Sequence, residues 1–117
     1  MTHTSLSNIA YAEGPMTAPV YAAVSVAGVQ SGATVVAAAG AGKKIRVLSL
    51  SISPAAASST LFKSATTAKT PTFTFAAAGL TQIHSGLGLF ETAANEALNV
   101  DTGAGAVGLQ LTYVVVG

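Results

Sequence analysis

Few side chains in this 117-residue chain are suited to acid–base or metal chemistry. The only histidines are His3 and His84, and cysteine is absent. Protein metal sites gather several His, Cys or carboxylate ligands, and this sequence offers no close histidine pair. The lack of cysteine also removes thiolate catalysis and disulfides. We therefore predict no metal, no cofactor and no catalytic residue, and interpret His84 as a loop or interface residue.

The acidic residues Glu91 and Glu96 form the one spacing that suggests catalysis. Two carboxylates at a suitable separation act as acid and nucleophile in glycosidases. The sequence does not fix that separation, and sugar-binding aromatics are scarce because Trp is absent. We interpret both residues as loop residues that hold a turn or pair with a cation, within one chain or across a subunit interface. Arg46, near a strand end, is expected to reach outward or to meet a carboxylate, with Glu91, Glu96 and Asp101 as the candidates.

Two glycine patterns resemble nucleotide-binding motifs. The segment 103–108 matches G-x-G-x-x-G, and Gly42-Lys43 resembles the end of a P-loop. Both motifs bind phosphates only where a helix follows the glycines. A strand pattern follows in both places, so we predict two hairpin turns.

Strands are predicted to position all of these residues. Apolar and polar residues alternate, which indicates half-buried strands. Pro54 ends one strand, because proline cannot donate to a ladder. Short helical turns could occupy 76–80 and 92–98. The predicted strands are 20–29, 34–38, 44–53, 60–64, 72–75, 97–100 and 107–115, with 82–84 as an eighth. Seven to eight short strands are typical of an all-β, antiparallel β-sandwich or barrel.

Alternation also predicts which side chains share a face. The third strand is expected to bury Leu48, Leu50 and Ile52, with Arg46 on the same face. The last strand is expected to place five side chains on one face: Val107, Leu109, Leu111, Tyr113 and Val115.

The chain carries very little charge. Charged residues make up 8% of it, against about 25% in ordinary soluble domains. Self-assembly, which covers surface, is one explanation; a monomer with a Ser- and Thr-rich surface is the other. The net charge of +1 gives no electrostatic case for nucleic acid or an anionic membrane. Pro15, Pro19 and Gln30 interrupt the charge-free stretch 14–42, which argues against a membrane span.

We expect residues 1–17 to form an extended N-terminal arm and 18–117 to form a single β-sandwich domain. A disordered tail is the alternative for the arm. Tyr11 and Tyr21 are candidate contact residues, together with Arg46, Glu91 and Glu96.

Three separated segments carry a family resemblance. They are Phe62-Lys63-Ser64, the run 90–100 (Phe-Glu-Thr-Ala-Ala-Asn-Glu-Ala-Leu-Asn-Val), and Leu111-Thr112-Tyr113. They resemble the C-terminal signature of small jelly-roll virion proteins of tailed bacteriophages. Asn95 stands where that pattern usually has Gly, and Asn tolerates a left-handed backbone. The resemblance spans about residues 44–116 and selects the jelly roll among sandwiches.

The resemblance implies a non-enzymatic structural protein on the virion, made in the host bacterial cytoplasm. The expected role is capsid decoration or cement, in which a homotrimer on the capsid surface bridges subunits of the major capsid protein. A tail, baseplate or head-fibre module that binds the host surface is the alternative. A sugar-binding or enzymatic jelly roll is a third interpretation, from another class.

Overall fold

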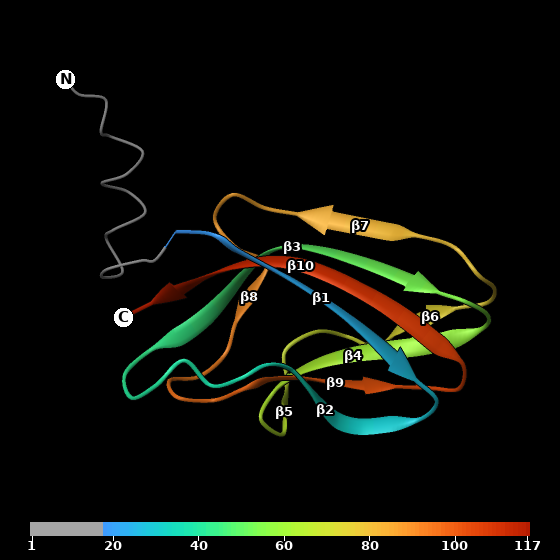
Figure 1. The fold of residues 1–117 in the computed structure, drawn as a ribbon, viewed down its shortest axis with the longest axis horizontal. Helices are drawn as coiled ribbons and strands as arrows, with labels where there is room; N and C mark the ends of the chain where they lie inside the picture. Colours follow the sequence, from blue (N-terminus) through green and yellow to red (C-terminus); the bar gives the residue numbers. More distant parts are fainter. Residues whose placement is uncertain (1–17) are drawn as a thin grey trace.

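The computed structural model describes residues 18–117 of the chain. Residues 1–17, where we expect the extended arm and Tyr11, lie outside the described residues. Within 18–117 the chain forms strands and turns and contains no helix (Figure 1). The ten strands of this range are β1 (Val20–Ala27), β2 (Gln30–Val36), β3 (Lys44–Pro54), β4 (Ser58–Ser64), β5 (Thr67–Ala68), β6 (Phe73–Phe75), β7 (Thr81–His84), β8 (Phe90–Glu91), β9 (Leu98–Thr102) and β10 (Ala106–Val116).

The strands form two antiparallel sheets. Sheet A has the order β1-β10-β3-β7, and β8 also pairs with β3. Sheet B has the order β2-β9-β4-β5, and β6 also pairs with β4. Because β7 and β8 lie along successive parts of β3, and β5 and β6 along successive parts of β4, each pair fills one strand position. Four positions in each of two sheets, in this order, make a jelly roll, which confirms the predicted sandwich.

Most connections cross from one sheet to the other. The turns before β3 and before β10 each join a strand of sheet B to a strand of sheet A. The predicted hairpins at Gly42-Lys43 and at Gly103–Gly105 are therefore wrong. Small and flexible residues indicate a turn, but the pairing of the flanking strands is set by residues far along the chain. The turn between β4 and β5 joins two strands that do pair with each other.

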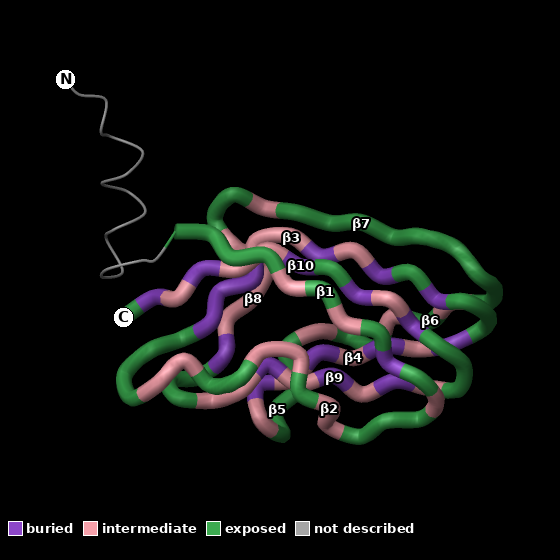
Figure 2. Tube along the Cα trace, in the orientation of Figure 1, coloured by how far each residue is buried: buried purple, intermediate pink, exposed green. Residues whose placement is uncertain are grey.

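The core lies between the sheets, where buried residues alternate along the strands (Figure 2). Phe62, expected to face inward, is completely buried. The register of β3 against β10 shifts at Leu48, since Tyr113 pairs with Val47 and Thr112 with Ser49. Such a bulge inserts one residue and changes which side chains face inward.

Two predicted strand faces, one on β3 and one on β10, are wrong near this bulge. Ile45 and Val47, not Leu48, join Leu50 and Ile52 in the core. On β10, Val107, Leu109 and Leu111 are buried as expected, and Tyr113 packs against the core. Val115 is only half-buried, whereas Val114 and Val116 are buried.

Local structure differs from the predictions at four more places. The helical turns expected at 76–80 and 92–98 are wrong: 76–80 is irregular, and 92–98 contains a non-helical turn with Asn95 in the left-handed conformation before β9 begins. β5 and β8 occur where no strand was predicted. Each has only two residues, so it is too short to show alternation.

Candidate functional site

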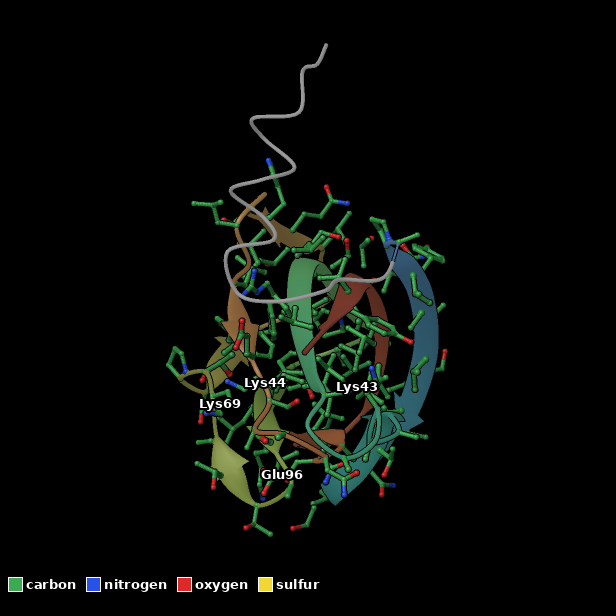
Figure 3. All side chains as sticks on the ribbon, turned by 90° about the vertical axis from the view of Figure 1, so that its left-hand side faces the viewer. Lys43, Lys44, Lys69 and Glu96 are labelled. Atoms are coloured by element: carbon green, nitrogen blue, oxygen red, sulfur yellow. The ribbon has the colours of Figure 1, made fainter. Side chains whose placement is uncertain are left out.

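The two ends of the sandwich differ sharply in charge. One end, the charged end, carries the β2–β3 turn, the β4–β5 turn and the segment between β8 and β9. All five Lys and Arg residues of the chain lie at or near it: Lys43, Lys44, Arg46, Lys63 and Lys69. Figure 3 looks onto this end and shows Lys43, Lys44, Lys69 and Glu96 facing the viewer.

Arg46 and Glu91 form an ion pair at this end. They lie opposite each other on β3 and β8. Arg46 Nε donates to Glu91 Oε2 at 2.6 Å, and a guanidinium NH2 group contacts the same oxygen. The Arg46 side chain is 7% exposed and that of Glu91 is 28% exposed. The expected contact between Arg46 and a carboxylate is therefore present, and its low exposure makes it a structural anchor for β8.

Glu96 has a different partner. Ser64 Oγ donates to Glu96 Oε1 at 2.6 Å and accepts from the backbone N–H of Ala93 at 2.9 Å. Asn95 adopts the left-handed conformation, with φ of 57°, and its N–H donates to the carbonyl of Lys43. The expected tolerance of Asn at this turn is thus confirmed. Glu96 therefore connects the loop to β4, and its role in holding the turn stays a prediction.

Thr92 ties the same loop to β3. The backbone N–H of Ile45 donates to Thr92 Oγ1 at 3.0 Å, and the Thr92 N–H donates to the Ile45 carbonyl at 2.9 Å. We name the 90–98 segment the clasp, because it bonds to β3 in sheet A and to β4 in sheet B. The sequence analysis did not single out Thr92 of the clasp or Ser64, the β4 residue to which the clasp bonds. Their only signal is that both lie within the segments that carry the family resemblance.

Those segments meet in space. Phe62 and Phe90 pack with ring centroids 6.0 Å apart at an interplanar angle of 36°, a geometry within the range of favourable aromatic pairs. The backbone of Tyr113 pairs with Val47, next to the Arg46–Glu91 pair. The resemblance therefore covers residues that hold this end of the fold together.

Three exposed lysines remain at the charged end. Lys63 contacts Asp101, with Nζ 3.2 Å from Oδ2. The side chains of Lys43, Lys44 and Lys69 form no ion pair within residues 18–117 and are exposed. Because Glu91 and Glu96 are engaged in contacts of the clasp, the exposed lysines make the surface of this end positive.

The opposite end is apolar and uncharged. Its loops comprise residues 28–29, 55–57, 76–80 and 103–105, and their sequences contain only Gly, Ala, Val and Leu. Val29 is 75% exposed and Leu80 is 62% exposed. No residue of these loops can titrate or bind a metal through its side chain.

Two hollows on the surface of residues 18–117 hold no catalytic constellation. A shallow hollow of about 420 Å³ lies on the outer face of sheet A, between Ser25, Ser51, Gly108 and Gln110. A smaller one of about 230 Å³ lies beside the Arg46–Glu91 pair. Across residues 18–117, no three His, Cys, Asp or Glu side chains gather as a metal site would require.

The remaining predicted residues are not brought together. His84 lies exposed on β7, opposite Ser49. Tyr21 lies on β1 and is 63% exposed. The structure joins Arg46 to Glu91, and Glu96 to Ser64, but leaves Tyr21 apart from both contacts. The contact role of Tyr21 stays a prediction.

Comparisons with known proteins find a likeness among solved structures alone. No protein-family model matches the chain, and no curated protein does. Among solved structures, the chain is similar to a protein of the cyanophage Pam1 capsid asymmetric unit, with 14% identity and a TM-score of 0.48 over 86% of this chain and 84% of that one. The strand order, rather than this likeness, defines the fold as a jelly roll. The described part of the chain has no helix long and apolar enough to cross a membrane.

Proposed function

We propose that the chain is a non-enzymatic structural protein of a bacteriophage virion, acting as a decoration or cement protein on the capsid surface. The observation that carries the proposal is the clasp. Three separated segments resemble small jelly-roll virion proteins, and these segments meet at one end of a jelly roll. The fold implied by the resemblance is thus the fold that the strand order gives.

The proposed mechanism is mechanical. Three copies form a trimer that sits where subunits of the major capsid protein meet. The trimer buries surface on more than one capsid subunit, which raises the free energy needed to separate them. This role needs no cofactor, nucleic acid or membrane, and it agrees with the scarcity of titratable side chains outside structural contacts.

The charged end is the proposed shell-facing end. Lys43, Lys44 and Lys69 are exposed there without an ion pair among the described residues. β1 begins at Val20, which pairs with Tyr113 in the half of the sandwich near this end. An acidic capsid surface would complement the lysines, and binding would weaken with salt.

A tail, baseplate or head-fibre module that binds the host surface is the second candidate. Leu80, Ile83 and Leu87, which are 62%, 37% and 76% exposed, favour it. They lie on the 76–88 segment, and exposed apolar side chains can form a contact surface. This candidate places the chain elsewhere on the virion but keeps the same fold.

Antibody-gold labelling of purified virions tests the two candidates. Even label over the head, together with DNA release at lower temperature from capsids that lack the protein, would support cementing. Label confined to the tail or its tip would replace cementing by host attachment. Absence of label from intact particles, with the protein present in infected cells, would overturn the virion role.

A further inference from the structure

The flank formed by β1 and β2 has no covering element within residues 18–117. β1 is the end strand of sheet A and β2 is the end strand of sheet B. They follow one another through Gly28 and Val29 and lie on the same side of the sandwich, at the right in Figure 3. We call this region the β1–β2 flank.

β1 presents a long, regular free edge. Its eight residues pair with β10 without any register shift, which makes the strand about 27 Å long. Between Val20 and Ala27 it contains no proline, no glycine and no charge. Natural proteins usually blunt such an edge with a charge, a proline, a bulge or a short strand. An edge without these devices is expected to be covered when the protein is assembled.

Except for Val26, which is 6% exposed, the core-facing side chains behind this edge are incompletely buried. Five apolar residues of the flank pack against the core yet stay half-exposed: Ala22, Val24, Ala33, Val35 and Val36. Their neighbours one strand further in, such as Leu109 and Val100, are at most 2% exposed. The core is therefore open on this flank, and a covering partner would complete it.

The lack of charge on the β1–β2 flank favours another copy of this chain as the partner. No charged residue occurs between positions 14 and 42, so nothing on the flank selects a basic or acidic partner. A neutral surface can face an identical surface without repulsion, whereas a surface with charges of one sign only cannot. The chain as a whole also has only 8% charged residues, which favours surface covered by self-assembly.

We propose that the β1–β2 flank is the surface through which copies of this chain bind one another. The three-fold arrangement rests on the proposed function: the narrow flanks of three copies converge on a common axis, and each completes the open core of its neighbours. Backbone groups of the β1 edge and the half-exposed side chains behind it then lie inside the trimer.

The first test places lysines beside the flank. Ser25 on β1 and Thr34 on β2 are exposed polar residues, so the double variant Ser25→Lys/Thr34→Lys should fold. We expect the full-length variant to elute and weigh as a monomer at concentrations where the parent protein is a trimer. Thr74→Lys/Thr81→Lys is the matched control, because both positions are exposed on β6 and β7 at the opposite flank. The control should stay trimeric.

The second test uses the absence of cysteine. Ser25→Cys introduces a single thiol at the flank, and Thr81→Cys introduces one at the opposite flank. In the trimer, a short thiol-reactive cross-linker should join Ser25→Cys chains to each other and should leave Thr81→Cys chains single. Circular dichroism of each variant confirms that the fold is retained.

The outcomes separate this inference from the proposed function. The β1–β2 flank is not the contact surface if trimers persist in the Ser25→Lys/Thr34→Lys variant. The same holds if the parent chain is monomeric at every concentration, whether or not the protein decorates capsids. Cross-linked β1 thiols in a particle with the mass of a dimer would support the flank as the contact surface between copies but would overturn the three-fold arrangement. Flank-dependent trimers that fail to bind capsids would support the flank and overturn cementing.

Discussion

The edge strands on the two flanks of the sandwich differ in length and regularity, most clearly for β1, since β2 pairs with β9 through two register shifts. On the flank of β5 to β8, the edge strands have two to four residues each. Pro71 and Lys69 interrupt the edge of sheet B, and the loop 85–89 interrupts the edge of sheet A. On the β1–β2 flank, β1 pairs regularly over eight residues without charge or proline. Short, broken and charged edges resist pairing with another chain, and long uncharged ones invite it.

The flanks also differ in how they are closed. Phe62 reaches Phe90 across the sheets, and the clasp bonds to both sheets through Thr92 and Ser64. On the other side, β1 and β2 are joined by a two-residue connection, and most of their apolar residues that pack against the core stay half-exposed. The contacts of the clasp across the two sheets on one side, and their absence between β1 and β2, agree with the proposal that a partner covers the β1–β2 flank.

The largest expected effect comes from opening the closed flank. Phe62→Ala removes a completely buried ring that contacts Phe90, and such truncations cost about 3–5 kcal/mol. Val35→Ala, on the β1–β2 flank, removes a half-buried side chain and should cost about 1 kcal/mol in the monomer. Urea unfolding of both variants measures the difference. Equal losses would remove the distinction between the flanks.

The dependence of the two stability losses on protein concentration tests the same comparison further. Burial in an assembly adds stability that depends on concentration. The cost of Val35→Ala should therefore rise as the protein passes from monomer to trimer, while that of Phe62→Ala should change little. A Val35→Ala cost that is independent of concentration would argue against cover at the β1–β2 flank.

A smaller effect is expected from Glu91→Ala. The variant removes the carboxylate that faces the Arg46 guanidinium, whose side chain is 7% exposed. Removing one partner of a buried pair is costly, and the partial exposure of Glu91 reduces the expected loss to about 2–3 kcal/mol. Thermal unfolding measures it, with Glu91→Gln as the milder comparison. Charge reversal at Arg46 without loss of stability would show that the pair does not anchor β8.

Gly88→Ala tests the same region through the backbone. Gly88 has φ of 111°, and an added Cβ would lie 2.7 Å from Cγ and Cδ of Arg46. Left-handed strain and displacement of the arginine should together cost about 1–2 kcal/mol. Gly86→Ala is the matched control, because no heavy atom lies within 4 Å of its added Cβ and its φ is not positive. Similar melting temperatures for the two variants would contradict the crowding at Gly88.

The all-β sandwich was predictable because its long strands alternate cleanly, whereas the jelly roll was implied only by the family resemblance. β1, β3, β4 and β10 all fall within the predicted ranges to within a few residues. The bulge at Leu48 was not predictable, since one inserted residue leaves a sequence that still alternates on either side of it. The connections between sheets were also missed, because the composition of a turn does not tell which strands pair.

The clasp was predictable in part. Arg46 and the carboxylates were singled out because a charge near a buried strand end needs a partner. Ser64 and Thr92 were not, because hydroxyl groups occur throughout this chain and only tertiary structure selects the two that bond to the loop. The open flank left its own trace in the sequence, namely the charge-free stretch 14–42, but the sequence alone does not show that β1 and β2 are both edge strands.

The smallest expected effect lies at the border of the open flank, at Asp101. Its Oδ1 accepts from the Gly32 N–H on β2 at 2.7 Å, and its carboxylate contacts Lys63. Asp101→Asn keeps an acceptor for Gly32 but loses the charge, and a partly exposed ion pair contributes less than about 1 kcal/mol. Asp101→Ala also loses the bond to Gly32, which should add about 1 kcal/mol. Hydrogen exchange at the Gly32 amide should therefore accelerate in Asp101→Ala but not in Asp101→Asn, because the carboxylate oxygen, rather than its charge, holds β2 in place. Equal exchange in both variants would mean that pairing with β9 alone fixes β2, and the open flank would then be more rigid than its partial burial indicates.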